Sequence, residues 1–132
     1  MKFAEQNQSM IKITRGSIIR VHLPDKNTSG KCIQEGERPM VVISNDICNN
    51  VSPVITALPL TSSDRKISKS MPTHVIIDDS DLERAGLVKK SVIMAEQFYT
   101  IDKRDIVMFM GTLPQKYIPF LEHAMKVQIG LA

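Results

Sequence analysis

Tryptophan is absent from the 132-residue chain, and aromatic residues make up only 5% of it. A sheet that stacks nucleotide bases on exposed aromatic rings, as RRM domains do, is therefore not expected. Long apolar runs are missing too, and none approaches the ~20 residues of a membrane-spanning helix. The first ten residues are polar and lack the apolar centre of a secretory signal. We expect a soluble, cytoplasmic protein with no membrane association.

Metal ligands and known catalytic motifs are also scarce. Cys32 and Cys48 fit neither a CxxC motif nor a zinc ribbon, which favours reduced, incidental thiols. His22, His74 and His123 fall on separate predicted elements without an HExxH-like pairing. The chain has no GxGxxG, Walker or GxSxG motif, so most enzyme classes lack their parts. We expect no metal site and no cofactor.

The composition that is present suits one small globular domain. The apolar fraction of 42% is sufficient for a single core, and the length leaves little room for a second. We expect an N-terminal extension at residues 1–10 and one domain at residues 11–132. The net charge of +3 permits a polyanionic partner without demanding one.

Short apolar stretches between turn-forming loops predict six strands. These are Ile18–Leu23, Met40–Ile43, Pro53–Thr61, His74–Ile77, Ser91–Phe98 and Ile106–Met110. The continuous run Met40–Ile43 is typical of a strand buried on both faces. Polar loops are predicted at residues 24–36, 44–52 and 62–72, and a turn closed by Gly86 follows the fourth strand.

The C-terminal segment has a helical period instead. Apolar positions recur every three or four residues from Tyr117 to Ile129, which predicts an amphipathic helix from about Gln115 to Gly130 with Pro119 in its first turn. Six strands and a closing helix, without strand–helix–strand units, predict a mainly β fold. The expected architecture is a small, closed or nearly closed antiparallel barrel with a C-terminal α-helix.

Two polar residues lie where predicted strands meet long loops, which is where binding groups are usually found. Arg38 precedes a buried strand, and Thr61 ends the next one. By itself, neither residue indicates catalysis: an arginine before a proline is usually a surface residue or an ion-pair partner, and a threonine at a strand end usually has no special role.

Five blocks of sequence, in order and at similar separations, resemble the MazF/PemK family of toxin ribonucleases. They are GERPMVVISND at 36–46, Ser52-Pro53 with the strand to Thr61, PTHV at 72–75, Glu96-Gln97 and TIDK at 100–103. The resemblance implies an SH3-like, PemK/CcdB-like barrel that forms a homodimer. It implies metal-independent cleavage of single-stranded RNA or mRNA at short motifs, leaving 2′,3′-cyclic phosphate and 5′-hydroxyl ends. It also implies a MazE-like antitoxin, with operator DNA bound only through that antitoxin.

The family's catalytic arginine and threonine map onto Arg38 and Thr61. A guanidinium fork suits the non-bridging phosphate oxygens, and a hydroxyl adds a further hydrogen bond. Arginine is a poor general base, so the base stays open. His74 is of the type suited to proton transfer near neutral pH, but a structural or RNA-contacting role is favoured for it.

A further set of polar residues is predicted to bind RNA. Cations after Thr61 would attract phosphates, and hydrogen-bonding groups would select bases. The set is Ser62, Ser63, Arg65, Lys66, Lys69, His74, Ser91, Glu96 and Gln97. A solvated loop is the alternative for the residues between 62 and 69, and a buried strand network is the alternative for Ser91, Glu96 and Gln97.

Two departures from the family pattern keep other functions open. Ser17 stands where the family commonly has aspartate, and the family's glutamate ahead of the arginine is either replaced by Ile33 or displaced to Glu35. The alternatives are a non-catalytic, CcdB-like inhibitor of a protein target such as gyrase, and a nucleic-acid-binding co-repressor of the same fold.

Overall fold

The structure is a computed structural model that describes residues 12–23, 36–69 and 71–132. The predicted N-terminal extension, Cys32 and nearly all of the first predicted loop lie outside these residues. The predicted boundary between the extension and the domain also lies there and stays a prediction.

Within the described residues the chain forms strands and short helices. The strands are β1 (Ser17–Leu23), β2 (Gly36–Val42), β3 (Val54–Thr61), β4 (His74–Ile77), β5 (Ser91–Met94), β6 (Tyr99–Asp102) and β7 (Ile106–Thr112). The α-helices are α2 (Asp46–Val51), α3 (Asp64–Ser68), α4 (Leu82–Ala85) and α5 (Ile118–Gln128). Single 3-10 turns are η1 (Asp79–Asp81), η2 (Lys103–Asp105) and η3 (Gln115–Tyr117).

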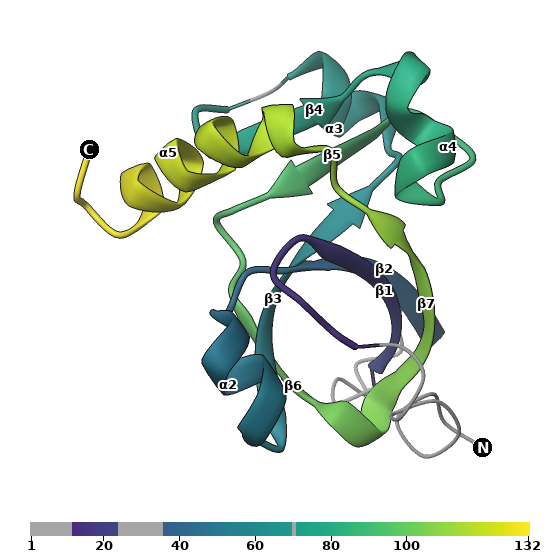
Figure 1. Cartoon of the computed structure of the whole chain (residues 1–132). Helices are drawn as coiled ribbons and strands as arrows, with labels where there is room; N and C mark the ends of the chain where they lie inside the picture. Colours follow the sequence, from purple (N-terminus) through teal and green to yellow (C-terminus); the bar gives the residue numbers. More distant parts are fainter. Residues whose placement is uncertain (1–11, 24–35, 70) are drawn as a thin grey trace, which may run out of the picture.

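The strands form one antiparallel sheet in the order β4-β5-β3-β2-β1-β7, and β6 pairs with the first half of β3. Figure 1 shows β1, β2, β3, β6 and β7 curving round into a ring, with α5 lying along β4 and β5. Since no pairing in the described part joins β7 to β4 or β6, the sheet is barrel-like and not fully closed. The predicted mainly β antiparallel fold with a C-terminal helix is confirmed.

The central strands bury both of their faces. Met40, Val41 and Val42 of β2 are each 0% exposed. Because side chains alternate along a strand, Val41 joins one apolar cluster with α5, while Met40 and Val42 join a second cluster on the other face. The prediction that this run is buried on both faces is confirmed, and it explains why the run is continuously apolar.

The C-terminal helix follows the predicted period. Tyr117, Leu121 and Ala124 are buried, and Pro119 lies in the first turn of α5, where its missing N–H costs no hydrogen bond. Gly86 closes α4 in the left-handed conformation, at φ +75°. Both predictions are confirmed.

Three predicted segments differ from the structure. The loop at 44–52 contains α2, whose cap is Asn45: its side chain accepts a 2.8 Å hydrogen bond from the Cys48 amide. The loop at 62–72 contains the single turn of α3. The predicted strand Ser91–Phe98 ends at Met94, where a turn leads into a separate strand, β6. No described helix has the length and apolarity needed to cross a membrane.

Candidate active site

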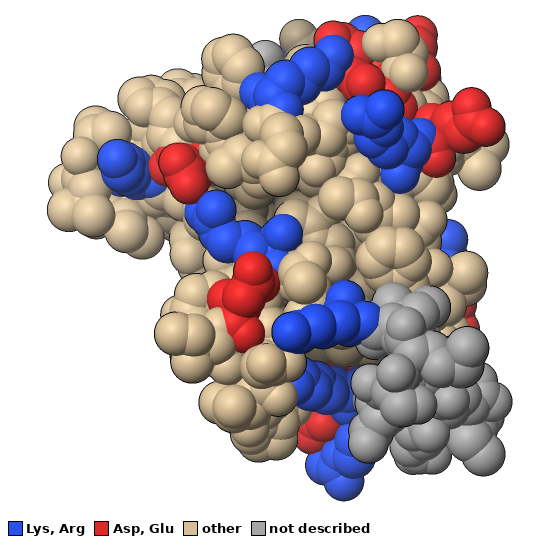
Figure 2. Space-filling view, viewed as in Figure 1, with Lys and Arg blue, Asp and Glu red and all other residues tan. Residues whose placement is uncertain are grey.

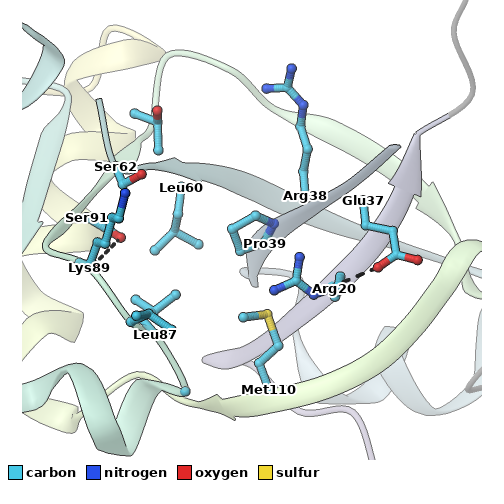
Figure 3. Close-up of a pocket in the computed structure, with 13 residues that line it drawn as sticks. Arg20, Glu37, Arg38, Pro39, Leu60, Ser62, Leu87, Lys89, Ser91 and Met110 are labelled. Atoms are coloured by element: carbon cyan, nitrogen blue, oxygen red, sulfur yellow. Dashed lines mark hydrogen bonds and ion pairs between the residues drawn. The ribbon is translucent and has the colours of Figure 1, made fainter. Parts of the chain in front are cut away.

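An open groove of about 760 Å³ lies where the ends of β2 and β3 meet the segment between α4 and β5. Its lining consists of Arg20, Glu37, Arg38, Pro39, Leu60, Thr61, Ser62, Gly86, Leu87, Val88, Lys89, Ser91 and Met110. Figure 3 shows Arg38 and Pro39 on one side and Ser62, Lys89 and Ser91 on the other, with Leu60 between them. The groove therefore has polar flanks and an apolar floor.

Arg38 and Thr61 come from neighbouring strands and line this same groove. The β2–β3 register sets Met40 opposite Pro59, and Arg38 and Thr61 lie two residues further toward the same end of the pair. Both side chains are half-buried. The Thr61 Oγ1 accepts a 3.3 Å hydrogen bond from the Ser63 amide. A guanidinium and a hydroxyl far apart in sequence are thus brought to one site.

Glycine shapes the wall opposite Arg38. A Cβ at Gly86 would collide with the backbone carbonyl of Met110, and a Cβ at Gly111 would lie 2.5 Å from the carbonyl carbon of Ala85. These two glycines let α4 approach β7 more closely than any side chain would permit. The close approach places Leu87 and Lys89 beside the groove.

The described lining carries three cations, Arg20, Arg38 and Lys89, and one carboxylate, Glu37. Arg20 Nε lies 4.0 Å from Glu37 Oε1, and both side chains are substantially exposed, so the pair is weak. Figure 2 shows Lys and Arg at several separate places on the visible face, with Asp and Glu among them. On that face, cations are not gathered into one basic patch.

The residues predicted to bind RNA divide into two groups. Ser62 and Ser91 line the groove, and the Ser91 hydroxyl donates a 2.8 Å hydrogen bond to the Lys89 carbonyl. Ser63, Arg65 and Lys69 lie on or beside α3 and are exposed, but they are not part of the groove lining. The side chain of Lys66 lies outside the described residues.

His74, Glu96 and Gln97 are not part of the groove lining either. His74 Nε2 lies 3.0 Å from Glu96 Oε2, and the His74 side chain is only 1% exposed. Thr73 Oγ1 donates a 2.9 Å hydrogen bond to the other oxygen of Glu96. Burial raises the pKa of Glu96, but hydrogen bonds from His74, from its own backbone and from Thr73 outweigh this effect and hold the pKa below its usual value.

Sequence reasoning missed Arg20, Glu37 and Lys89 as groove residues. Arg20 lies opposite Pro39 in the β1–β2 register, a pairing that could be found only after the register of these strands was known. Lys89 follows the Gly86 turn, and only the approach of α4 to β7 brings it to the groove. Among the described residues, no group of His, Cys, Asp and Glu could hold a metal ion.

Comparison with known proteins places the chain in a family. Residues 14–129 match the family described as the PemK-like, MazF-like toxin of type II toxin-antitoxin systems. Endoribonuclease EndoA of Bacillus subtilis is 35% identical over 74% of this chain and 80% of its own length. Endoribonuclease MazF of Staphylococcus saprophyticus is 34% identical over 84% of this chain and 88% of its own length.

Solved structures share the fold at lower sequence identity. A mycobacterial endoribonuclease in complex with its cognate antitoxin has a TM-score of 0.70 and 20% identity, over 91% of this chain and 97% of its own. A MazE-MazF structure from Deinococcus radiodurans has a TM-score of 0.69 and 19% identity, over 92% of this chain and 99% of its own. With the family match spanning nearly all of the described residues, the chain belongs to the PemK-like, MazF-like toxin family of type II toxin–antitoxin systems.

Proposed function

We propose that the protein is a toxin that acts as a metal-independent endoribonuclease on single-stranded RNA, including mRNA, and thereby inhibits translation and growth. The observation that carries this proposal is that Arg38 and Thr61 line one open groove. Relatives at 32–35% identity are named as endoribonucleases, which supports the same reaction class.

The main catalytic requirement of RNA cleavage is stabilisation of the negative charge that develops on the phosphate. The ribose 2′-hydroxyl attacks the adjacent phosphorus, the bond to the 5′-oxygen breaks, and a 2′,3′-cyclic phosphate and a 5′-hydroxyl result. Negative charge grows on the non-bridging oxygens as the new bond forms. The Arg38 guanidinium offers a fork of donors to these oxygens, and the Thr61 hydroxyl offers another.

Proton transfer requires an acid for the leaving 5′-oxygen and a base for the 2′-hydroxyl. Arg38 can also donate a proton toward the leaving 5′-oxygen, whereas it is a poor acceptor because a guanidinium carries only donors and no acceptor. His74 has both ring nitrogens engaged outside the groove, so it is not the base. No described side chain is assigned to remove the 2′-hydroxyl proton.

The partners follow from this function. They are single-stranded RNA, a MazE-like antitoxin, a second copy of the chain in a homodimer, and operator DNA through the antitoxin only. Neighbours of the same fold have been solved with their antitoxins, which supports the antitoxin assignment. A cytoplasmic location is part of the proposal, because mRNA is the substrate.

Incubation of the purified protein with a long RNA in EDTA tests the proposal. The native chain should cut the RNA and leave cyclic phosphate and 5′-hydroxyl ends. Arg38→Ala should lose about 10²–10³ in rate, the usual effect of removing one donor to a developing anion. Arg38→Lys should recover only part of this loss, because an ammonium lacks the fork.

Arg104→Ala is the matched control, since Arg104 is exposed and lies against Asp102, away from the groove. Normal cleavage by a folded Arg38→Ala variant would refute the proposed role of Arg38. No cleavage by the native chain, together with a DNA-damage response on expression, would favour the CcdB-like alternative. Nucleic-acid binding without cleavage would favour the co-repressor.

A further inference from the structure

The segment between β3 and β4 begins at the groove and carries exposed cations. Thr61 and Ser62 line the groove, and Arg65 and Lys69 follow on or beside α3. Neither Arg65 nor Lys69 forms an ion pair within the described part of the chain. They are therefore available to a polyanion that extends beyond the groove.

Little apolar packing holds this segment. The helix α3 has five residues, too few to be stable by itself, and Ile67 is its only half-buried side chain among those described. Met71 is 51% exposed, and Pro72 is exposed as well. Beyond the contact of α3 with β5, the order of the segment depends on the contacts at its two ends.

His74 provides the contact at the second end. Its ring Nδ1 accepts a 3.2 Å hydrogen bond from the Met71 amide, and its own amide donates a 2.9 Å bond to the Met71 carbonyl. Both backbone groups of Met71 are thus bound to one residue. Because the Met71 side chain is half exposed, these two bonds are the main contacts that hold its backbone.

Glu96 fixes the tautomer that this arrangement needs. An Nδ1 that accepts a hydrogen bond leaves the ring proton on Nε2, which donates to Glu96 Oε2 at 3.0 Å. Thr73 Oγ1 donates to Oε1 of the same carboxylate, and the Thr73 carbonyl accepts from the Ala95 amide at 2.9 Å. The carboxylate of the turn after β5 thus orients the ring.

We propose that His74, oriented by Glu96, is a positioning residue for RNA binding: by accepting the Met71 amide it holds the chain where it enters β4, and so helps to present Arg65 and Lys69 to the RNA backbone. His74 does not touch the RNA. This inference rests on the proposed function, and it replaces the direct RNA contact predicted for His74 and Glu96. A loose segment would lose conformational entropy on each binding event, whereas an ordered one loses little.

Two substitutions at His74 separate its two hydrogen bonds. His74→Asn keeps an acceptor at the atom bonded to Cγ and so keeps the bond to Met71, but it cannot reach Glu96. His74→Gln keeps a donor toward Glu96 but has no acceptor beside Cγ for Met71. Both variants remove the same ring from the same buried site, so they share the loss of packing.

The first measurement is cleavage of a defined RNA. His74→Gln should raise KM about tenfold, because binding must then order roughly one more backbone residue. Its kcat should stay within twofold of the native value. His74→Asn should restore KM to within about threefold. His123→Gln, on the exposed face of α5, controls for loss of a histidine.

The second measurement is limited trypsin digestion, which does not depend on RNA cleavage. Trypsin cuts after Arg65, Lys66 and Lys69, and a loosened segment is cut faster. His74→Gln should be cut in this segment at least fivefold faster than His74→Asn, at equal urea unfolding midpoints.

The outcomes distinguish this inference from the proposed function. Equal digestion rates for the Asn and Gln variants, or a loss confined to kcat, would overturn the positioning role. A native chain that cuts no RNA would overturn the proposed function and the RNA-binding purpose with it. In that case the digestion rates would still decide whether His74 holds the segment.

Discussion

The Tyr117 hydroxyl donates a 2.6 Å hydrogen bond to Oδ2 of Asp81 and thereby fastens the start of the C-terminal helix to the turn after β4. The same hydroxyl accepts a 2.8 Å bond from the Asp78 amide, and Lys116 Nζ lies 2.8 Å from the same Asp81 oxygen. Hydrogen bonds from Lys116 and Tyr117 lower the pKa of Asp81 from its ordinary value of 3.8.

This carboxylate predicts a dependence of stability on acid. A folded-state pKa below the unfolded one gives a stabilisation that is complete above pH 3.8 and is lost as the pH falls through the folded value. Asp81→Asn should therefore lower the urea midpoint at neutral pH and flatten its decline below about pH 4. Asp79→Asn, an exposed change on the same turn, is the control. Equal slopes for Asp81→Asn and native protein would contradict the prediction.

Replacing Gly111 should weaken both the fold and the groove. A Cβ there lies 2.5 Å from the carbonyl carbon of Ala85 and 2.6 Å from the Arg84 carbonyl oxygen, so backbone must move. Gly111→Ala should lower the free energy of unfolding by about 1–3 kcal/mol, the usual cost of overpacking. Urea denaturation measures this change. Thr112→Ala, the exposed neighbour, should have little effect, and equal losses in the two variants would exclude the close approach as the cause.

Thr61→Val tests the hydroxyl with almost no change of shape. Loss of one donor to the reacting phosphate should reduce kcat by about 10²–10³ while KM changes little. Thr61→Ser, which keeps the hydroxyl, should recover most of the rate. Thr100→Val changes an exposed strand threonine on β6 and should leave kcat unchanged. A Thr61→Val enzyme with native kcat would remove Thr61 from the catalytic groups.

Glu37→Gln should strengthen RNA binding. Glu37 is the only carboxylate in the described lining, and it places a negative charge beside Arg20 and Arg38. Its removal should lower KM about two- to threefold at low salt, which corresponds to the interaction energy of one exposed charge. The difference in KM should vanish at about 1 M salt, because salt screens exposed charges. A large fall in kcat instead, with loss of the acidic limb of the pH–rate profile, would identify Glu37 as the proton acceptor.

Most of the strands and the closing helix could be predicted because their signals are local. Burial on both faces leaves a continuous apolar run at Met40–Val42. Gly86 marks a left-handed backbone conformation that few other residues adopt, and Pro119 marks the first turn of a helix because proline is excluded from its interior. Arg38 and Thr61 were found through the family resemblance. Their shared groove is consistent with that resemblance, while their roles stay predictions.

The helix α2 and the His74–Glu96 pair were not predicted. The first depends on a helix cap within a polar segment, and the second depends on strand register. Asn45 is a standard helix cap, yet the short helix α2 that it starts lies in a segment rich in polar residues. The His74–Glu96 pair requires the β4–β5 register, in which His74 lies opposite Met94, two residues before Glu96. Periodicity within one strand contains no information on that register. The RNA-binding role predicted for both residues followed from the family resemblance, and a buried network was the alternative for Glu96.

The position of β1 between β2 and β7 has a consequence for synthesis. Residues 17–21 pair with residues 106–112, so this part of the sheet joins segments from opposite ends of the chain. Such long-range pairing is slow to form and must wait for the later partner. Met110 of β7 also contributes to the groove. A nascent chain therefore cannot complete its groove until β7 has left the ribosome. The toxin acquires its full groove only when its own translation is almost finished.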